Sequence, residues 1–239
     1  DVMAEKANTS IHLLAIPGIR AEEITTYTLQ KVEDRFDAFF LMDINQYDSS
    51  NELLSGSEDN GLYIPSTVGH TTTHVKNTAS VFSGRNLDSS FGAAYFPDVE
   101  IVHANENQGV TENIVVPPTV AILGAFGLND RIAQPYFAPA GFSRGRMGDA
   151  ISEYTQLNDT NITRLFSARV NPIYSMANSN GPVVFAQKTL LRAQNALDRI
   201  NVRRLLIDVR RKVKEKSRNI LFEQNRASTL AQFSEQCNG

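Results

Sequence analysis

Two short apolar runs separated by one amphipathic segment constrain the fold of this chain more than any other feature. The runs are IHLLAIPG (residues 11–18) and DAFFLMDI (residues 37–44), and apolar runs of this length predict buried strands. The intervening residues 21–36 have an acidic start and then apolar positions, which predicts an amphipathic helix. These positions are Glu22, Glu23, Ile24, Tyr27 and Phe36. Strand, helix and strand in close succession predict a βαβ unit with parallel strands.

The rest of the chain continues this alternation of strands and helices. We expect helices at 66–83, 119–133, 201–224 and 227–236, strands at 89–103 and 182–190, and a turn at 105–113. Pro97 would lie at a strand end or a bulge, and Pro117 and Pro118 would start a helix. Residues 134–180 are rich in Pro, Gly, Asn and Ser and receive no assignment. The predicted class is α/β, with a mixed or parallel sheet flanked by helices and a helix-rich C-terminal part.

Composition sets limits on the class of protein. The chain has 239 residues, of which 41% are hydrophobic, enough for one large or two small domains. It has no run of about 18 apolar residues, so we expect no membrane span. The first ten residues do not resemble a signal peptide and lack an initiator Met, so we expect a segment from within a longer chain. The single cysteine, Cys237, excludes an internal disulfide and a multi-thiolate metal site.

Charge is distributed unevenly along the chain. Residues 188–239 carry 12 Lys/Arg against 5 Asp/Glu, whereas residues 1–187 carry 11 against 21. The predicted helix at 201–224 concentrates the positive charge, and its apolar residues, such as Leu206 and Val209, keep to one helical stripe. We take its cations as candidate interface residues: Arg203, Arg204, Arg210, Arg211, Lys212, Lys214, Lys216 and Arg218.

Three interpretations of this basic helix stay open. It is a solvated helix face, or it docks on an acidic protein surface, or it binds nucleic acid or anionic lipid. No aromatic residue that could stack on bases lies within residues 199–220, which argues against single-stranded nucleic acid. The overall net charge of −3 also disfavours a general nucleic-acid binder.

Two glycine-containing segments invite a phosphate-binding interpretation and do not support it. Gly124 and Gly127 form G-x-x-G inside a helical pattern, without the strand–G-x-G-x-x-G–helix arrangement of a dinucleotide site. Close helix packing or a helix end explains them better. GFSRGRMG (residues 141–148) lacks the Gly-Lys-Ser/Thr of a P-loop, so a surface loop is the better interpretation.

No set of residues has the pattern of a catalytic or metal site. His70 and His74 have zinc-pair spacing, but Thr71 stands where a zinc protease has its glutamate, and no third ligand is evident. Asp43 follows a predicted strand where open α/β sheets often place ligand contacts, which alone is weak evidence. Cys237 has no nearby base. We therefore expect no catalytic residues, no cofactor and no bound metal.

Four motifs in order resemble those of contractile tail sheath proteins of myophages, most closely the giant phiKZ-like group. The first pairs LLAIPGI with RFDAFFLMD, a proline-glycine turn and the following strand. The others are SSFGAAYFPDVEI (89–101), VPPTVAILGAFGLNDRIAQPYFAPAG (116–141) and INVRRLLIDVRRKVKEKSRNILFEQN (200–225). Phe91, Asp98 and Thr119 depart from the family's usual Tyr, Trp and Ser, and Thr229 stands about where the family often has Trp.

The resemblance implies a tail-sheath core in two parts, an α/β sheath domain at 1–115 with an outward insertion at about 45–65, and a truncated C-terminal domain at 116–239. It implies a structural, non-enzymatic subunit that forms stacked hexameric rings around a tail tube in the virion and contracts after a baseplate signal. The partners would be other copies, the tube protein, the baseplate and the tail terminator, with neither nucleic acid nor membrane. Without the family's N- and C-terminal arms, this fragment is expected to be monomeric. An α/β enzyme with an unrecognised site and a nucleic-acid-binding module are the alternatives.

Overall fold

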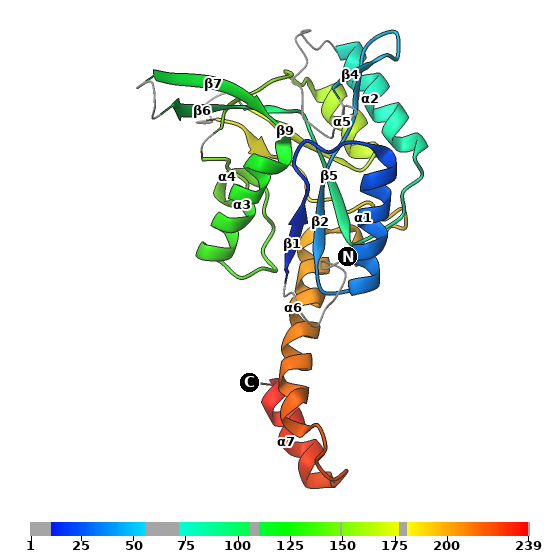
Figure 1. Cartoon of the computed structure of the whole chain (residues 1–239), viewed down its shortest axis with the longest axis vertical. Coiled ribbons are helices and arrows are strands. Elements are labelled where there is room, and N and C mark those ends of the chain that lie inside the picture. The colour runs from blue at the N-terminus through cyan, green and yellow to red at the C-terminus, as the bar shows by residue number, and fades with distance from the viewer. Residues whose placement is uncertain (1–10, 56–71, 106–109, 149, 177–180, 239) are drawn as a thin grey trace.

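A five-stranded sheet forms the centre of the molecule, in the order β1-β2-β5-β9-β10 (Figure 1). The computed structural model describes residues 11–55, 72–105, 110–148, 150–176 and 181–238. The strands are β1 (Leu13–Ala15), β2 (Phe39–Asp43), β5 (Gly92–Phe96), β9 (Val170–Tyr174) and β10 (Val183–Val184). The first four are parallel, and β10 runs antiparallel to β9. The predicted α/β class with a mixed sheet is confirmed.

The βαβ unit predicted from the first two apolar runs is present. Helix α1 (Glu22–Arg35) connects β1 to β2, which pair in parallel with Leu13 opposite Phe39. The predicted buried face of α1 is wrong, however. The helix buries Thr25, Thr28, Leu29, Val32 and Arg35. It leaves the three apolar positions exposed: Ile24, Tyr27 and Phe36.

A second, three-stranded antiparallel sheet has the order β7-β6-β8. It contains β6 (Val99–Asn105), β7 (Val110–Val116) and β8 (Ala150–Glu153), and β6 and β7 project from the body as a long hairpin (Figure 1). The prediction of a single strand at 89–103 is therefore wrong. Strand β5 ends at Phe96, before the cis Phe96–Pro97 bond, and the next strand, β6, belongs to the second sheet. The turn predicted at 105–113 is also wrong at its end, since β7 begins at Val110.

Helices cover the sheets. They are α2 (Thr72–Gly84), α3 (Pro118–Ile132), α4 (Gly141–Arg144), α5 (Asp159–Ser167) and the short 3-10 helix η2 (Ala196–Asp198). Pro117 and Pro118 begin α3 as predicted. Part of the predicted polar loop at 45–65 is ordered as a hairpin of β3 (Gln46–Tyr47) and β4 (Leu53–Ser55), while 56–65 lie outside the described residues. Gln46 is buried, and Tyr47 donates its N–H to the Thr78 hydroxyl on α2 at 2.9 Å.

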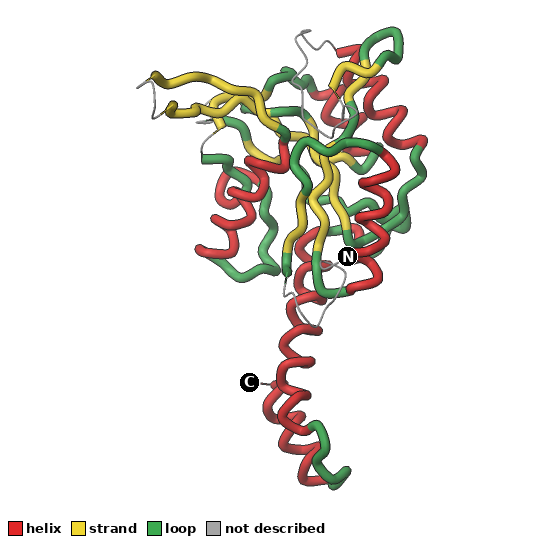
Figure 2. Tube along the Cα trace, viewed as in Figure 1, coloured by secondary structure: helices red, strands yellow, loops and turns green. Residues whose placement is uncertain are grey.

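The C-terminal helices form a stalk that leaves the body, which Figure 2 shows as two helices side by side below it. We define the stalk as residues 200–238, containing α6 (Ile200–Ser217), the 3-10 turn η3 (Arg218–Ile220) and α7 (Ala227–Asn238). The remaining described residues are the body. Both predicted C-terminal helices are thus confirmed, whereas the strand predicted at 182–190 is limited to Val183–Val184.

The central sheet takes strands from both sides of residue 115. β1, β2 and β5 precede it, and β9 and β10 follow it. The division into 1–115 and 116–239 stays a prediction, and a boundary there would cut this sheet. In the described part of the chain, none of the helices has the length and apolar content needed to cross a bilayer.

Candidate subunit interface

The first turn of the basic helix α6 is anchored in the body by two of its predicted interface residues. Arg204 is 6% exposed, pairs with Asp130 of α3 at 2.5 Å and stacks over the Phe126 ring at 4.9 Å. Arg203 hydrogen-bonds the Ser90 hydroxyl and lies 4.1 Å from the Phe91 ring centroid; burial lowers its pKa. Arg203 and Arg204 therefore both contact the body, and their role as interface residues stays a prediction.

The next turn neutralises two more of the candidate cations within the helix. Asp208 accepts hydrogen bonds from Arg211 at 2.8 Å and contacts Lys212 at 3.0 Å. Burial alone would raise the pKa of Asp208, but hydrogen bonds and positive charge from Lys212 and Arg211 outweigh it and lower the pKa. Arg211 and Lys212 thus present a partly compensated charge to any partner.

Four candidate cations remain along the exposed length of α6. Arg210 lies 4.9 Å over the ring of Phe36, and Lys214, Lys216 and Arg218 are exposed on the stalk. Together with Lys212, whose side chain is 65% exposed, these four residues are the part of the predicted set that the structure leaves accessible. Their role in an interface stays a prediction.

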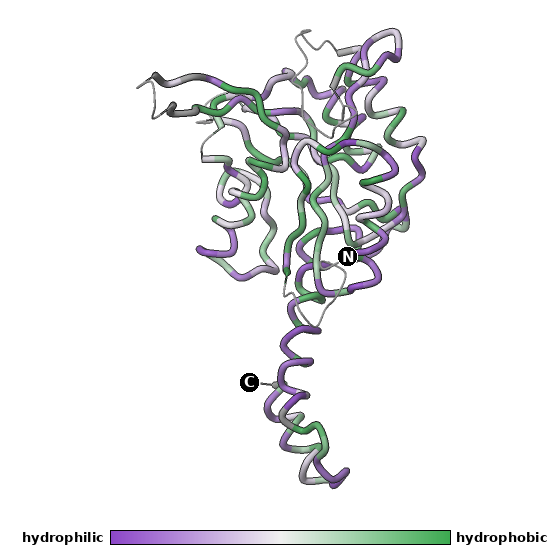
Figure 3. Tube along the Cα trace, in the orientation of Figure 1, coloured by the Kyte–Doolittle hydropathy of each residue, from purple (hydrophilic) through white to green (hydrophobic). Residues whose placement is uncertain are grey.

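The apolar stripe of α6 is largely exposed in this structure. Leu206 and Val209 are each 45% exposed, and Leu205 and Val213 are also exposed. Buried positions of α6 are instead Ile200, Arg204, Ile207 and Asp208. Figure 3 shows apolar and polar positions alternating along the stalk. The stripe is therefore a surface that the described residues leave partly uncovered.

A buried polar joint ties four elements of the body together. Asp43, at the end of β2, accepts the N–H of Gly18 at 3.0 Å, the N–H of Thr119 at 3.1 Å and the Thr119 hydroxyl at 2.7 Å. Arg20 donates to Asp98 at 2.6 Å and to the Ile44 carbonyl at 3.1 Å. Burial raises the pKa of Asp43, while the positive charge of Arg20 and the hydrogen bonds to Asp43 make this rise smaller.

This joint gives Asp43 a structural role rather than a ligand-binding one. It fixes the β1–α1 turn, the start of α3 and the start of β6 around the carboxyl end of β2. Two residues at which the motifs depart from those they resemble belong to this joint: Asp98 is the partner of Arg20, and the Thr119 hydroxyl donates to Asp43. Arg20 was missed from the sequence because an isolated arginine after a turn is usually exposed.

The glycine segments have no phosphate-binding geometry. Gly124 and Gly127 lie inside α3 on its exposed side, and a Cβ on either would meet no atom within 4 Å. The predicted explanation, close packing or a helix end, is therefore wrong within this chain. At Gly145, by contrast, a Cβ would lie 2.6 Å from the Ala140 backbone, so glycine is required by close approach.

The histidine pair cannot be assessed as a pair, because His70 lies outside the described residues. His74 is buried on α2. Among the described residues, no group of three His, Cys, Asp or Glu side chains is placed to hold a metal ion. Cys237 is exposed in α7.

Comparisons of the sequence with known proteins find two similar proteins of the same kind. No protein-family model matches the chain. The tail sheath protein of Vibrio phage KVP40 is 31% identical over 118 residues, covering 49% of this chain and 17% of that protein. The tail sheath protein of Enterobacteria phage T4 is 30% identical over 118 residues, covering 49% and 18%. The matched region thus covers less than a fifth of the length of each of these two relatives.

Solved structures match almost the whole chain. The contracted helical sheath of the anti-feeding prophage has a TM-score of 0.61 at 22% identity, covering 95% of this chain and 52% of that one. The contracted sheath complex of the extracellular contractile injection system PVC has a TM-score of 0.64 at 19% identity, covering 94% and 52%. The chain therefore has the fold found in about half of a contractile sheath subunit.

Proposed function

We propose that this chain is part of a structural subunit of a contractile phage tail sheath. The observation that carries the proposal is the sheath fold over 94–95% of the chain, together with sequence identity of 30–31% to two phage tail sheath proteins. The proposed role is mechanical rather than enzymatic, and the protein would reside in the virion tail. The closer relationship to giant phiKZ-like phages rests on motif order alone.

The proposed mechanism needs no nucleotide hydrolysis. Copies of the full-length subunit assemble as stacked rings around a tail tube in an extended, metastable helix, and a baseplate signal triggers a shorter, wider arrangement. The driving free energy is then the difference between two packings set at assembly. The hydrogen bonds of Asp43, Arg20 and Asp98 connect several elements of the body into one rigid unit. Rigid units suit this role, because they can exchange one set of contacts with their neighbours for another.

The accessible cations of α6 are the proposed contact with the tube or with a neighbouring subunit. Arg210, Lys214, Lys216 and Arg218 meet the solvent on a stalk outside the body (Figure 1). Because residues 1–187 carry a net negative charge, an acidic surface on another copy is a suitable partner. Nucleic acid is less suitable, since half of the predicted basic set is engaged by the fold itself or by Asp208.

The test is electron microscopy of the full-length protein, with and without purified tubes. Wild type should form rings or sheaths, and Lys214→Glu/Lys216→Glu/Arg218→Glu should impair assembly on tubes. A matched control is Lys76→Glu/Arg164→Glu/Arg192→Glu, which reverses three exposed charges in the body. If the stalk variant forms normal sheaths, the basic helix does not contribute to assembly on the tube. Failure of wild type to assemble at any salt concentration would contradict the sheath function itself.

A further inference from the structure

Helix α1 presents an acidic and aromatic outer face. Glu23, Tyr27, Gln30 and Asp34 are exposed and spaced i, i+4, i+7 and i+11, so they form one stripe along the helix. Tyr27, at the centre of the stripe, is 51% exposed. The described residues leave this face uncovered.

Helix α3 presents an outer face with the same spacing and the opposite character. Val120, Gly124, Gly127 and Arg131 are exposed at i, i+4, i+7 and i+11. Glycine inside a helix lowers its stability, and neither glycine is needed by the backbone or by packing within this chain. The two glycines leave a shallow furrow in the helix surface into which a side chain from another molecule can pack.

Charge and apolar surface continue beyond the end of α3. Residues 131–148 include Arg131, Arg144 and Arg146 and no acidic residue. Exposed apolar side chains accompany them: Ile132, Tyr136, Phe137 and Phe142. An open depression of ≈ 510 Å³ lies here, with Arg131, Ile132, Phe137 and Arg144 among its lining residues.

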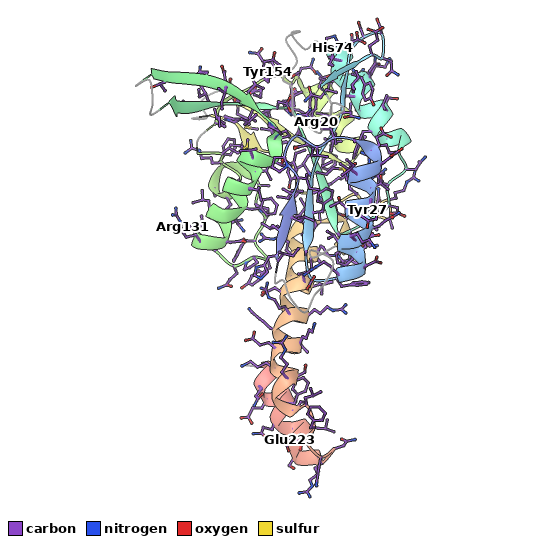
Figure 4. The ribbon with its side chains drawn as sticks, in the orientation of Figure 1. Arg20, Tyr27, His74, Arg131, Tyr154 and Glu223 are labelled. Atoms are coloured by element: carbon purple, nitrogen blue, oxygen red, sulfur yellow. The ribbon has the colours of Figure 1, made fainter. Side chains whose placement is uncertain are left out.

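The two faces lie on opposite sides of the body, as the labels of Tyr27 and Arg131 show in Figure 4. They also lie at the same level and run in the same direction. Both helices begin beside Asp43, which is bonded by Gly18 and by Thr119. Both end beside α6, where Arg210 stacks on Phe36 after α1 and Arg204 pairs with Asp130 of α3.

We propose that the α1 face of one copy binds the α3 face of the next copy, side by side. The occupant is a second copy because the α1 face carries Glu23 and Asp34, whereas the end of the α3 face and the segment after it carry Arg131, Arg144 and Arg146. Parallel alignment brings Tyr27 onto Gly124 and Asp34 to Arg131. Because the two patches differ and face opposite ways, the contact is head to tail and generates a ring or an open helix. This contact rests on the proposed sheath function and specifies one of its interfaces.

The sharpest variants fill the furrow without disturbing the chain. Gly124→Leu/Gly127→Leu adds good helix formers where no atom lies within 4 Å, so the monomer should fold at least as well as wild type. In the full-length protein we expect the polymer fraction in pelleting assays to fall at least about tenfold, because a blocked interface cannot close. Ser80→Leu on the exposed side of α2 is the matched control and should assemble normally.

Charge exchange tests the partner assignment. Glu23→Arg/Asp34→Arg and Arg131→Glu/Arg144→Glu should each reduce assembly, and combining all four should restore it, because the charges are then complementary again. A cross-link in the present chain gives an independent readout. Tyr27→Cys/Gly124→Cys, in a Cys237→Ser background, should form a ladder of disulfide-linked oligomers, whereas either cysteine alone should give no ladder.

The outcomes separate this contact from the sheath function. If wild type assembles, and the glycine and charge variants do so equally well, the contact is wrong and the sheath function stands. If wild type does not assemble but the cysteine pair forms its ladder, the contact stands and the sheath function fails. If neither assembly nor a ladder is seen, both are overturned.

Discussion

The body and most of the stalk differ in the burial of their charged and apolar side chains. In the body, Arg20, Asp43 and Asp98 are buried and bonded, and the strands β2 and β5 are buried at every position. In the stalk, cations such as Lys214 lie in solvent, and apolar side chains such as Leu206 are exposed. Phe222, in the loop between η3 and α7, is 98% exposed.

This difference separates what the chain needs in order to fold from what it offers to others. A buried charge is tolerated only with a close partner, so the polar joint of the body has one arrangement. An exposed leucine costs a monomer little, and contiguous exposed apolar surface is typical of binding sites. We therefore interpret the body as the rigid unit and the stalk, with the outer faces of α1 and α3, as contact surface.

The largest expected effect tests the rigidity of the body. Arg20→Met leaves Asp98 buried without its 2.6 Å partner, and we expect the free energy of unfolding to fall by about 3–5 kcal/mol. Arg218→Met, at an exposed position of the stalk, should change it by less than about 0.5 kcal/mol. Urea unfolding followed by circular dichroism measures both. If the two variants lower the free energy of unfolding equally, the body is not the more rigid part and the comparison with the stalk is wrong.

A matched pair of leucines sharpens the same distinction for apolar side chains. Leu165 of α5 is fully buried, so Leu165→Ala should cost about 2–4 kcal/mol through lost contacts and a residual cavity. Leu206→Ala removes a side chain that is 45% exposed and should cost less than about 1 kcal/mol in the isolated chain. A large cost at Leu206 would show that the chain itself covers the α6 stripe.

Local patterns were sufficient to predict much of the architecture of the body and the first helix of the stalk. The βαβ unit, the proline-initiated α3 and the basic α6 all depend on short-range periodicity and helix-start signals. The change of sheet after Phe96 and the strand β9 were missed. β9 is the five residues VNPIY inside a polar segment, and its place is set by pairing with β5, a contact across more than seventy residues.

The candidate interface was predictable in position but not in detail. The eight candidate cations do lie in α6 and directly after it, but the sequence could not tell that Arg203 and Arg204 point into the body. That depends on Ser90, Phe91, Phe126 and Asp130, which the fold brings together from distant segments. For the same reason the apolar positions of α1 suggested the wrong face, because the fold buries a face with Thr25 and Thr28 instead of Ile24 and Tyr27.

The smallest expected effect lies at the junction of body and stalk. Asp208→Asn should lower the free energy of unfolding by about 0.5–1 kcal/mol at neutral pH, since exposed Lys212 and half-buried Arg211 contribute modestly. The pKa of Asp208 is lowered in the folded chain, so its contribution is fully present above the ordinary value of 3.8 and disappears as the pH falls through the lowered value.

The difference between wild type and Asp208→Asn should therefore shrink on acidification. Urea titrations at neutral pH and at about pH 3 measure it, because the carboxylate is progressively protonated below its ordinary pKa. Glu223→Gln, an exposed carboxylate of the stalk, is the control and should show no such trend. A difference that stays constant with pH would mean that Asp208 acts through packing rather than charge. Asp208 would then belong to the body, and the stalk would begin after it rather than at Ile200.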